Sequence, residues 1–179
     1  MSFSSLLLAG RTKIEAILYP TEDNYVDSRS GAANTVFNNQ NYLITDWGTV
    51  YGTAWNTTRS FMKFDITAWA NTPTQVKLWY RSSFSEPVSH DSDIFNVDAT
   101  WDTETLTWNN QPSLTDSLID LTIPAWQDWA YVDITSIYNA WKAWPNYWLA
   151  IWWTDFSSVN NRRLYSSETW NSPYLEIIS

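Results

Sequence analysis

Short segments in which apolar and polar residues alternate are spread along the chain. The clearest are residues 60–66, 76–81 and 174–178. Because neighbouring side chains of a strand point to opposite faces, this alternation predicts strands with one buried face. Further strands are expected at residues 13–18, 42–45, 94–97, 130–134, 147–153 and 163–166. Many short strands separated by turn residues predict an all-β fold, an antiparallel β-sandwich of the jelly-roll type.

One short helix is expected beside these strands. Asp133 or Thr135 can cap its first turn, and Ile137 and Trp141 fall on one of its faces. The helix has to end before Pro145, since proline cannot continue it. It is expected to cover one end of the sandwich.

The 179 residues are expected to form a single domain. Residues 1–12 contain a short apolar run that no Lys or Arg precedes, and the run is shorter than the ~7 residues of a secretion signal core. They are predicted to form an N-terminal arm, and residues 13–179 the domain, because no linker rich in Gly, Pro or Ser divides the chain. No run approaches the ~18 apolar residues of a membrane span, so none is predicted.

Charge and cysteine content exclude several kinds of partner and site. The chain has 10 Lys and Arg against 19 Asp and Glu, a formal net charge of -9. This charge repels phosphate backbones, so no nucleic-acid partner is predicted. The chain has no cysteine, which excludes disulfides, thiol nucleophiles and thiolate zinc sites.

The carboxylates do not form a recognisable catalytic set. The candidates are Asp65, Asp102, Glu104, Asp133 and Glu168. Nothing in their spacing fixes a pair that would flank a glycosidic bond, and they are expected to end strands, cap turns and bond to local backbone. The single histidine, His90, is expected in a polar loop, where it supports neither a catalytic triad nor a multi-histidine metal site. We therefore predict that the chain is not an enzyme.

No cofactor is predicted, although two pairs of acidic residues have the chemistry of calcium ligands. Asp91 with Asp93, and Asp23 with Asp27, offer carboxylate oxygens that suit Ca²⁺. Their spacing lacks the glycine and the terminal glutamate of a helical calcium loop. A solvated acidic loop is the preferred interpretation, and structural calcium remains the alternative.

Residues 101–112, with the sequence WDTETLTWNNQP, place rings, carboxylates, hydroxyls and amides at offsets that follow no period. Such a string suits neither a helix nor a plain strand. It predicts a folded-back segment in which large rings fill a core while Asn, Asp and Thr side chains bond to local backbone. The role of this segment is therefore expected to be structural.

Six segments together, this one included, resemble the DNRLRE domain family, also described as carbohydrate-binding module family 96. They are residues 19–28, 58–66, 101–112, 132–136 with Trp141, 145–147, and 165–168 followed by 173–177. The resemblance spans roughly residues 15–179. It implies a jelly-roll β-sandwich of the kind found in secreted polysaccharide-active proteins, cell-surface proteins and phage virion proteins, generally without catalysis of its own.

The chain departs from the family pattern at several tryptophans. Trp55, Trp144, Trp148 and Trp170 stand where the pattern tends to have glycine, and Trp126 is a further case. The chain has 14 Trp and 4 Gly, an inversion of ordinary usage. One hypothesis is a genetic code in which UGA specifies glycine, so that translation with another table writes tryptophan. The alternative is that these are real rings that pack between protomers.

Outward-facing rings are the candidate binding residues. The ligand or interface candidates are Trp79, Arg81, Trp126, Trp129, Trp148 and Trp152. Alternation places Trp79 on the face opposite Leu78, and it places Trp148 and Trp152 outward at about 13 Å from each other. Rings of this kind stack on sugars, and they equally anchor protein interfaces.

The sequence favours a non-catalytic surface module, a decoration or adhesion protein docked on a virion capsid or tail. Its expected partners are other virion or surface-assembly proteins, a second copy of the chain, and polysaccharide. Its expected location is the virion surface or the extracellular space. The alternative is a carbohydrate-binding module of a secreted or cell-surface protein.

Overall fold

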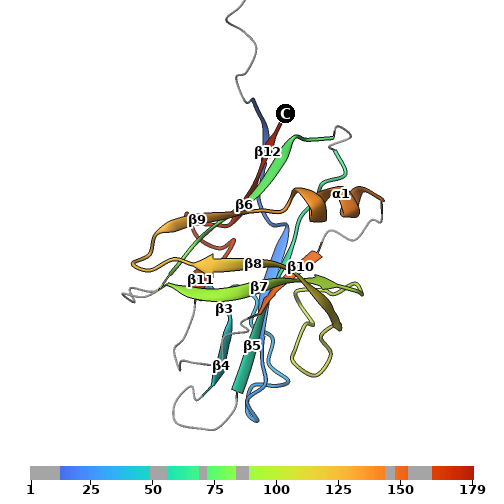
Figure 1. Cartoon of the computed structure of the whole chain (residues 1–179). Coiled ribbons are helices and arrows are strands. Elements are labelled where there is room, and N and C mark those ends of the chain that lie inside the picture. The colour runs from blue at the N-terminus through green and yellow to red at the C-terminus, as the bar shows by residue number, and fades with distance from the viewer. Residues whose placement is uncertain (1–12, 49–55, 69–71, 84–88, 144–147, 153–162) are drawn as a thin grey trace, which may run out of the picture.

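The computed structural model describes residues 13–48, 56–68, 72–83, 89–143, 148–152 and 163–179. These residues form antiparallel sheets in a sandwich-like arrangement, with one short helix at its end (Figure 1). The predicted all-β sandwich with a single short helix is confirmed for this part of the chain. The predicted N-terminal arm, residues 1–12, lies outside the described residues, and the division into arm and domain stays a prediction.

Two large sheets and a small one make up the sandwich. Sheet A has the strand order β1 (Ile14–Leu18), β12 (Tyr174–Ile178), β6 (Gln75–Arg81) and β9 (Trp129–Asp133). Sheet B has the order β2 (Glu22–Asp27), β5 (Asn56–Lys63), β10 (Trp148–Trp152), β7 (His90–Val97) and β8 (Leu114–Ile123), and β4 (Asp46–Gly48) also pairs with β5. The small sheet pairs β3 (Tyr42–Ile44) with β11 (Arg163–Tyr165).

Strand β6 shows how the alternation builds the core. Val76, Leu78 and Tyr80 are at most 1% exposed and belong to the large apolar cluster between the sheets. The residues between them, including Trp79, are half-buried on the outer face of sheet A. Inner-facing residues of sheet B, such as Leu149 and Ile151, complete this cluster. The period of two therefore fixes which side chains face the core.

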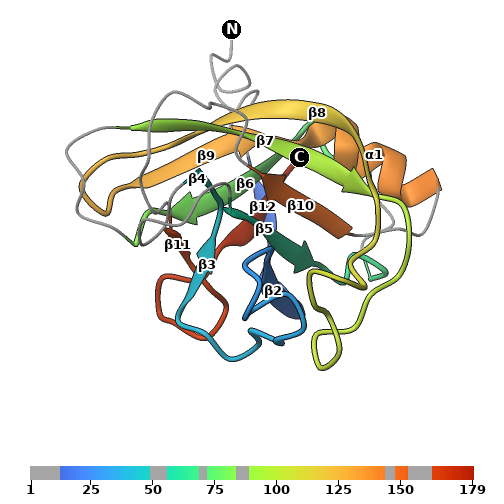
Figure 2. The same cartoon turned by 90° about the horizontal axis from the view of Figure 1, so that it is seen from below.

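A second apolar cluster lies on the outer face of sheet B. Phe61 and Ala150 alternate with inner residues of the same strands, so they point away from the main core. Trp101 and Leu106 pack onto them from the connection between β7 and β8. We call residues 98–113 the cover segment; it lies beside β2 and β5 in both views (Figures 1 and 2).

Helix α1 (Thr135–Ala143) lies where the sequence predicted it. Asp133 Oδ1 accepts a hydrogen bond from the Thr135 backbone N–H at 2.9 Å, which satisfies one of the free donors of the first turn. Ile137 and Trp141 are buried on the side of the helix that faces the sandwich. None of the helices in the described part of the chain is long and apolar enough to cross a membrane.

The prediction of an acidic loop around residue 91 is wrong. His90, Asp91 and Asp93 lie in strand β7, and Asp91 Oδ1 accepts a hydrogen bond from the Thr122 hydroxyl of β8 at 3.0 Å. Asp27, in strand β2, pairs with Arg29. Within the described ranges, no group of three or more His, Asp or Glu side chains is placed to hold a metal ion.

Candidate functional site

Four aromatic side chains form a row across the outer face of sheet A. Tyr174, Trp79 and Tyr131 occupy paired positions on β12, β6 and β9, and Tyr19 directly follows β1. The ring centroids are 6.0 Å apart for Tyr19 and Tyr174, 6.0 Å for Tyr174 and Trp79, and 4.8 Å for Trp79 and Tyr131. We call these four residues the ring row.

The ring row is accessible from solvent. Tyr19 is 59% exposed and Tyr131 is 50% exposed, while Trp79 and Tyr174 between them are half-buried. The planes of the Trp79 and Tyr174 rings lie within 17° of parallel. Trp129 adds a fifth ring, 5.7 Å from that of Tyr174. The predicted outward direction of Trp79 is confirmed, and its neighbours across the sheet are rings.

A charged row runs beside the ring row and orients its central indole. Glu176, Lys77 and Asp133 occupy the next outward positions on β12, β6 and β9. The Trp79 indole N–H donates to Glu176 Oε2 at 2.9 Å, and Lys77 Nζ lies 3.6 Å from the same oxygen. Lys77 Nζ also lies 4.8 Å from the centroid of the Tyr131 ring. These contacts hold the indole and the ammonium in fixed positions.

Arg81 connects the end of the ring row to two loops. Its Nε donates to the Gln127 carbonyl oxygen at 2.7 Å, and its Nη1 donates to Asn171 Oδ1 at 2.5 Å. The two partners are sequence neighbours of the exposed residues Trp126 and Trp170. Arg81, predicted as a ligand or interface residue, thus binds the loops that precede β9 and β12, and its guanidinium is engaged within the chain.

Trp126 has an unusual backbone conformation. Its φ is 58° and that of Gln127 is 57°, in the left-handed region that glycine adopts without strain and that other residues adopt at a cost. Its side chain is 65% exposed, and Trp170 is fully exposed, so packing contacts offset little of that cost at Trp126. The conformation at 126 therefore suits glycine. Trp55 and Trp144 lie outside the described residues, and the recoding hypothesis stays a prediction.

Trp148 and Trp152 lie on the outer face of sheet B, as the alternation predicted, but other side chains cover them. Trp148 packs against the second apolar cluster. The Arg59 guanidinium lies between two rings, 4.3 Å from the centroid of Trp152 and 4.9 Å from that of Trp108 in the cover segment. The Nε1 atoms of both Trp148 and Trp152 are buried. Both side chains keep partial exposure, and their role in ligand or interface contacts stays a prediction.

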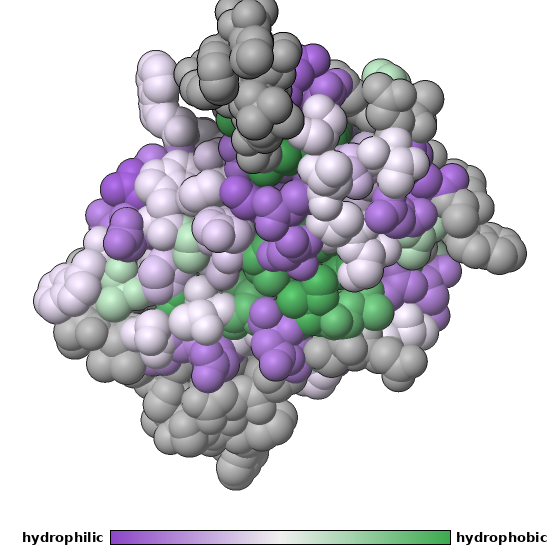
Figure 3. Space-filling model, turned by 45° about the horizontal axis from the view of Figure 1, so that its top comes forward, coloured by the Kyte–Doolittle hydropathy of each residue, from purple (hydrophilic) through white to green (hydrophobic). Residues whose placement is uncertain are grey.

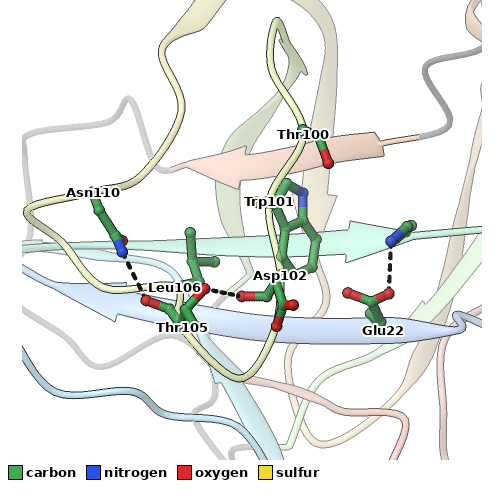
Figure 4. A pocket seen from close by; sticks show the side chains of 8 residues that line it. Glu22, Thr100, Trp101, Asp102, Thr105, Leu106 and Asn110 are labelled. Carbon is green, nitrogen blue, oxygen red and sulfur yellow. Dashed lines mark hydrogen bonds and ion pairs between the residues drawn. The ribbon is translucent and has the colours of Figure 1, made fainter.

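A polar cavity of about 400 Å³ lies beside the cover segment (Figure 4). It is lined by Glu22, Lys63, Thr100, Trp101, Asp102, Thr105, Leu106 and Asn110. Two of its polar side chains bond to nearby backbone: Asp102 Oδ1 accepts from the Glu104 backbone N–H, and Asn110 Nδ2 donates to the Thr105 carbonyl. Lys63 Nζ lies 2.6 Å from Glu22 Oε1. The prediction that residues 101–112 fold back and bond to their own backbone is confirmed.

Asp23 joins the cover segment to the loop before β12. Its Oδ2 accepts a hydrogen bond from the Ser167 backbone N–H at 2.6 Å, and its carbonyl oxygen accepts one from the Thr103 hydroxyl at 3.1 Å. The neighbouring Asn24 donates to the Thr103 carbonyl at 3.1 Å. Burial raises the pKa of Asp23 to about 6. Strand β2 thus connects the cover segment to the loop that precedes β12.

The sequence identified Trp79, Arg81 and Trp129 near this surface but missed three of its rings, Tyr19, Tyr131 and Tyr174. Each tyrosine lies in or beside a predicted strand, and the alternation of residues 174–178 places Tyr174 outward with Glu176. The face shown in Figure 3 has a green apolar area among pale and purple residues; Trp and Tyr rank as mildly hydrophilic on this scale, so the green area is not made by the ring row. Only the pairing of strands brings the rings into one row.

The model of carbohydrate-binding module family 96 matches residues 15–179, nearly the whole chain. None of the curated proteins compared with the chain matches it. The family match agrees with the span of the six sequence segments, roughly residues 15–179. Modules of this type bind carbohydrate, do not themselves catalyse reactions, and typically occur in secreted or extracellular proteins. The chain belongs to carbohydrate-binding module family 96.

Proposed function

We propose that this chain is a non-catalytic module that binds polysaccharide through the ring row. The observation that carries the proposal is the continuous line of Tyr19, Tyr174, Trp79 and Tyr131 across four strands, on a face that the described chain leaves open. Aromatic ring faces contact the C–H groups of sugar rings, and nearby polar groups bond the hydroxyls. Trp129 extends this surface toward Arg81.

The dimensions of the ring row suit a chain rather than a single sugar. Neighbouring strands lie about 4.8 Å apart, so a row across four strands extends over roughly 15 Å. Successive rings on such a line can contact successive sugars of one polysaccharide. The fixed Trp79 indole reduces the entropy that is lost on binding, since its Nε1 is already bonded to Glu176.

The virion decoration role that the sequence favoured uses the same rings differently, because Trp and Tyr also anchor protein interfaces. Membership of a carbohydrate-binding family supports the alternative interpretation instead, a module of a secreted or cell-surface protein. We place the protein in an extracellular setting on that ground. Docking to a virion or to a second copy of the chain is retained only as an outcome of the binding test.

Affinity electrophoresis in gels that contain soluble polysaccharides tests the proposal. We expect at least one polysaccharide to retard the protein, and we expect Trp79→Ala to weaken its affinity at least about tenfold, the equivalent of ~1.4 kcal/mol. Trp152→Ala, on the covered face, should leave the affinity unchanged once near-ultraviolet circular dichroism confirms folding. Leu118→Ala is a control for loss of an exposed apolar side chain elsewhere.

Two results would contradict the proposed binding site, and a third would contradict the non-catalytic role. One is the absence of retardation by every polysaccharide tested, with self-association in sedimentation that Trp79→Ala abolishes; this would point to a protein interface. The other is retardation that Trp79→Ala does not change, which would move the site away from the ring row. Release of reducing ends from a bound polysaccharide would contradict the non-catalytic role.

A further inference from the structure

We propose that the polar cavity beside the cover segment is a second carbohydrate site, which takes one or two sugar units at the end of a glycan chain. Two of its lining residues, Glu22 and Lys63, lie on the paired strands β2 and β5 of sheet B. Lys63 alternates with the inward residue Met62 and shares the outer face with Phe61. The cavity is therefore separate from the ring row, which crosses the outer face of sheet A.

The cavity has the size of a small ligand site. Its volume of about 400 Å³ lies near the lower end of the ~300–1,000 Å³ that is usual for such sites. This volume suits a short saccharide rather than a long stretch of polysaccharide. The wall that the cover segment provides is formed before a ligand arrives, because Asp102 and Asn110 bond to backbone of the same segment. A preformed wall reduces the entropy that is lost on binding.

Lys63 and Glu22 form the charged end of the cavity. Lys63 Nζ lies 2.6 Å from Glu22 Oε1, and both side chains keep 28% exposure. An ammonium group has three N–H donors, and a carboxylate accepts several hydrogen bonds, so the pair leaves donors and acceptors available. A sugar hydroxyl both donates and accepts. One hydroxyl can therefore bond the ammonium and the carboxylate together.

The cover segment adds further polar groups and an apolar wall. Thr100 and Asp102 are exposed, and within the described part of the chain neither the Thr100 hydroxyl nor Asp102 Oδ2 makes a hydrogen bond. Trp101 and Leu106 provide the apolar part of the lining. Figure 4 shows Glu22 and Asp102 beside the Trp101 ring. Polar groups next to an apolar wall match a sugar, in which C–H groups lie beside hydroxyls.

Nuclear magnetic resonance of the ¹⁵N-labelled protein tests the site through the indole N–H signal of Trp101, which the spectrum of Trp101→Phe identifies. The probes are cellobiose, maltose, mannobiose and digalacturonate, each titrated to millimolar concentration. We expect at least one of them to shift the Trp101 signal in a saturable way. Trp79→Ala should leave the dissociation constant unchanged, because Trp79 lies on the other outer face.

A free disaccharide and the end of a chain present the same chemistry to the cavity, and a longer probe separates them. The tetrasaccharide of the same sugar should shift the Trp101 signal with a similar dissociation constant, because only its end has to enter. Binding of the disaccharide without the tetrasaccharide would contradict the assignment to chain ends.

Lys63→Met tests the contacts that the cavity offers. The variant keeps an unbranched side chain and removes the ammonium, and we expect it to weaken the affinity for the disaccharide at least about tenfold. Lys142→Met, on helix α1, makes the same change outside the cavity and should leave the affinity unchanged. Thr100→Val removes one exposed hydroxyl without leaving a charge unpaired, so it keeps the test valid if Lys63→Met does not fold. It should weaken the affinity about threefold.

Three results would overturn the cavity site. They are the absence of any shift of the Trp101 signal with all four disaccharides, an unchanged affinity in both Lys63→Met and Thr100→Val, and loss of disaccharide binding in Trp79→Ala, which would place the ligand on the ring row.

The cavity site and the proposed function can fail separately. Chain ends are few in a polysaccharide, so the cavity does not sustain the retardation that we assign to the ring row. Retardation that Trp79→Ala abolishes, without disaccharide binding, would leave the proposed function standing and the cavity site refuted. Disaccharide binding that depends on Lys63, without any retardation, would do the reverse.

Discussion

The two large sheets present aromatic residues on their outer faces, and the two faces serve different purposes. On sheet A, the ring row of Tyr19, Tyr174, Trp79 and Tyr131 is open to solvent. On sheet B, the cover segment packs onto the outer face, and its own Trp101 is only 6% exposed. A ring therefore contributes to binding or to stability according to what lies above it.

The difference arises from how the polar groups near each set of rings are used. In the cover segment, Asp102 and Asn110 bond to backbone within their own turns. These bonds hold the segment in the conformation that packs onto the second apolar cluster. On sheet A, Glu176 and Arg81 orient the rings and the adjoining loops without covering them. Four substitutions test this difference between the two outer faces.

The largest expected effect is at the covered ring Trp101. Trp101→Ala leaves a cavity in the second apolar cluster and should lower the free energy of unfolding by about 3–5 kcal/mol. Urea unfolding followed by circular dichroism measures this loss. A loss below about 1 kcal/mol would mean that the cover segment is not part of the folded core.

The next effect depends on pH and concerns Asp23, which joins the cover segment to the loop before β12. Its pKa is about 6 in the folded protein against an ordinary value of 3.8, so the folded state binds the proton more tightly than the unfolded chain. Its contribution to stability is present below about pH 4 and is lost as pH rises through 6, in total about 3 kcal/mol. Asp23→Asn should remove this part of the pH dependence between pH 4 and 7.

Urea unfolding of the unaltered protein and of the variant from about pH 3 to 7 measures the difference, because the lowered pKa of the control residue Asp65 affects stability only at the acid end of this range. Asp65→Asn is the control of opposite sign, because the hydrogen bond from the Thr67 hydroxyl lowers the pKa of the exposed Asp65. If the two variants changed the pH profile in the same direction, the buried state of Asp23 would be contradicted.

The open ring Trp79 should matter little for stability. Trp79→Ala removes contacts with Tyr174 and Tyr131 but opens no enclosed cavity, so we expect a loss of about 1 kcal/mol in the free energy of unfolding. The same urea experiment compares it with Trp101→Ala. Equal losses in the two variants would remove the distinction between the open and the covered face.

The smallest expected effect is a gain. Trp126→Gly relieves the positive φ and should raise the free energy of unfolding by about 1 kcal/mol or less, since glycine also costs entropy. Trp129→Gly, within strand β9, is the matched control and should destabilise the protein. Thermal unfolding measures both.

The codon that specifies residue 126 and the intact mass of the protein from its natural host test the recoding hypothesis separately. A UGA codon together with the mass expected for glycine would support it. A UGG codon would reject it at this position, and the left-handed conformation would then belong to a genuine tryptophan.

The fold was largely predictable because most strands keep a strict alternation. Strands β6 and β12 and helix α1 lie within a residue or two of their expected bounds. Strand β2 was missed because its sequence is mostly polar. Its Asp23, Asn24 and Asp27 are nevertheless buried, and hydrogen bonds and an ion pair satisfy their polar groups. Strand β8 was missed because irregularities in its pairing with β7 shift the phase of its residues.

The candidate site was only partly predictable. The direction of Trp79 follows from its neighbours in β6, whereas its contacts with Tyr131 and Tyr174 depend on strands that are far apart in the sequence. The same alternation placed Trp148 and Trp152 outward, but it contains no information about the cover segment above them. Alternation describes one strand at a time, and a binding surface combines several.

Local sequence is enough to tell which side chains of a strand point inward and which point outward, because a strand has a period of two. It also determined that residues 101–112 turn back on themselves, because Asn, Asp and Thr bond to nearby backbone. Which outer face stays open could be seen only in the folded molecule. That choice depends on where a long connection packs, and packing is a contact between distant segments that local sequence does not encode.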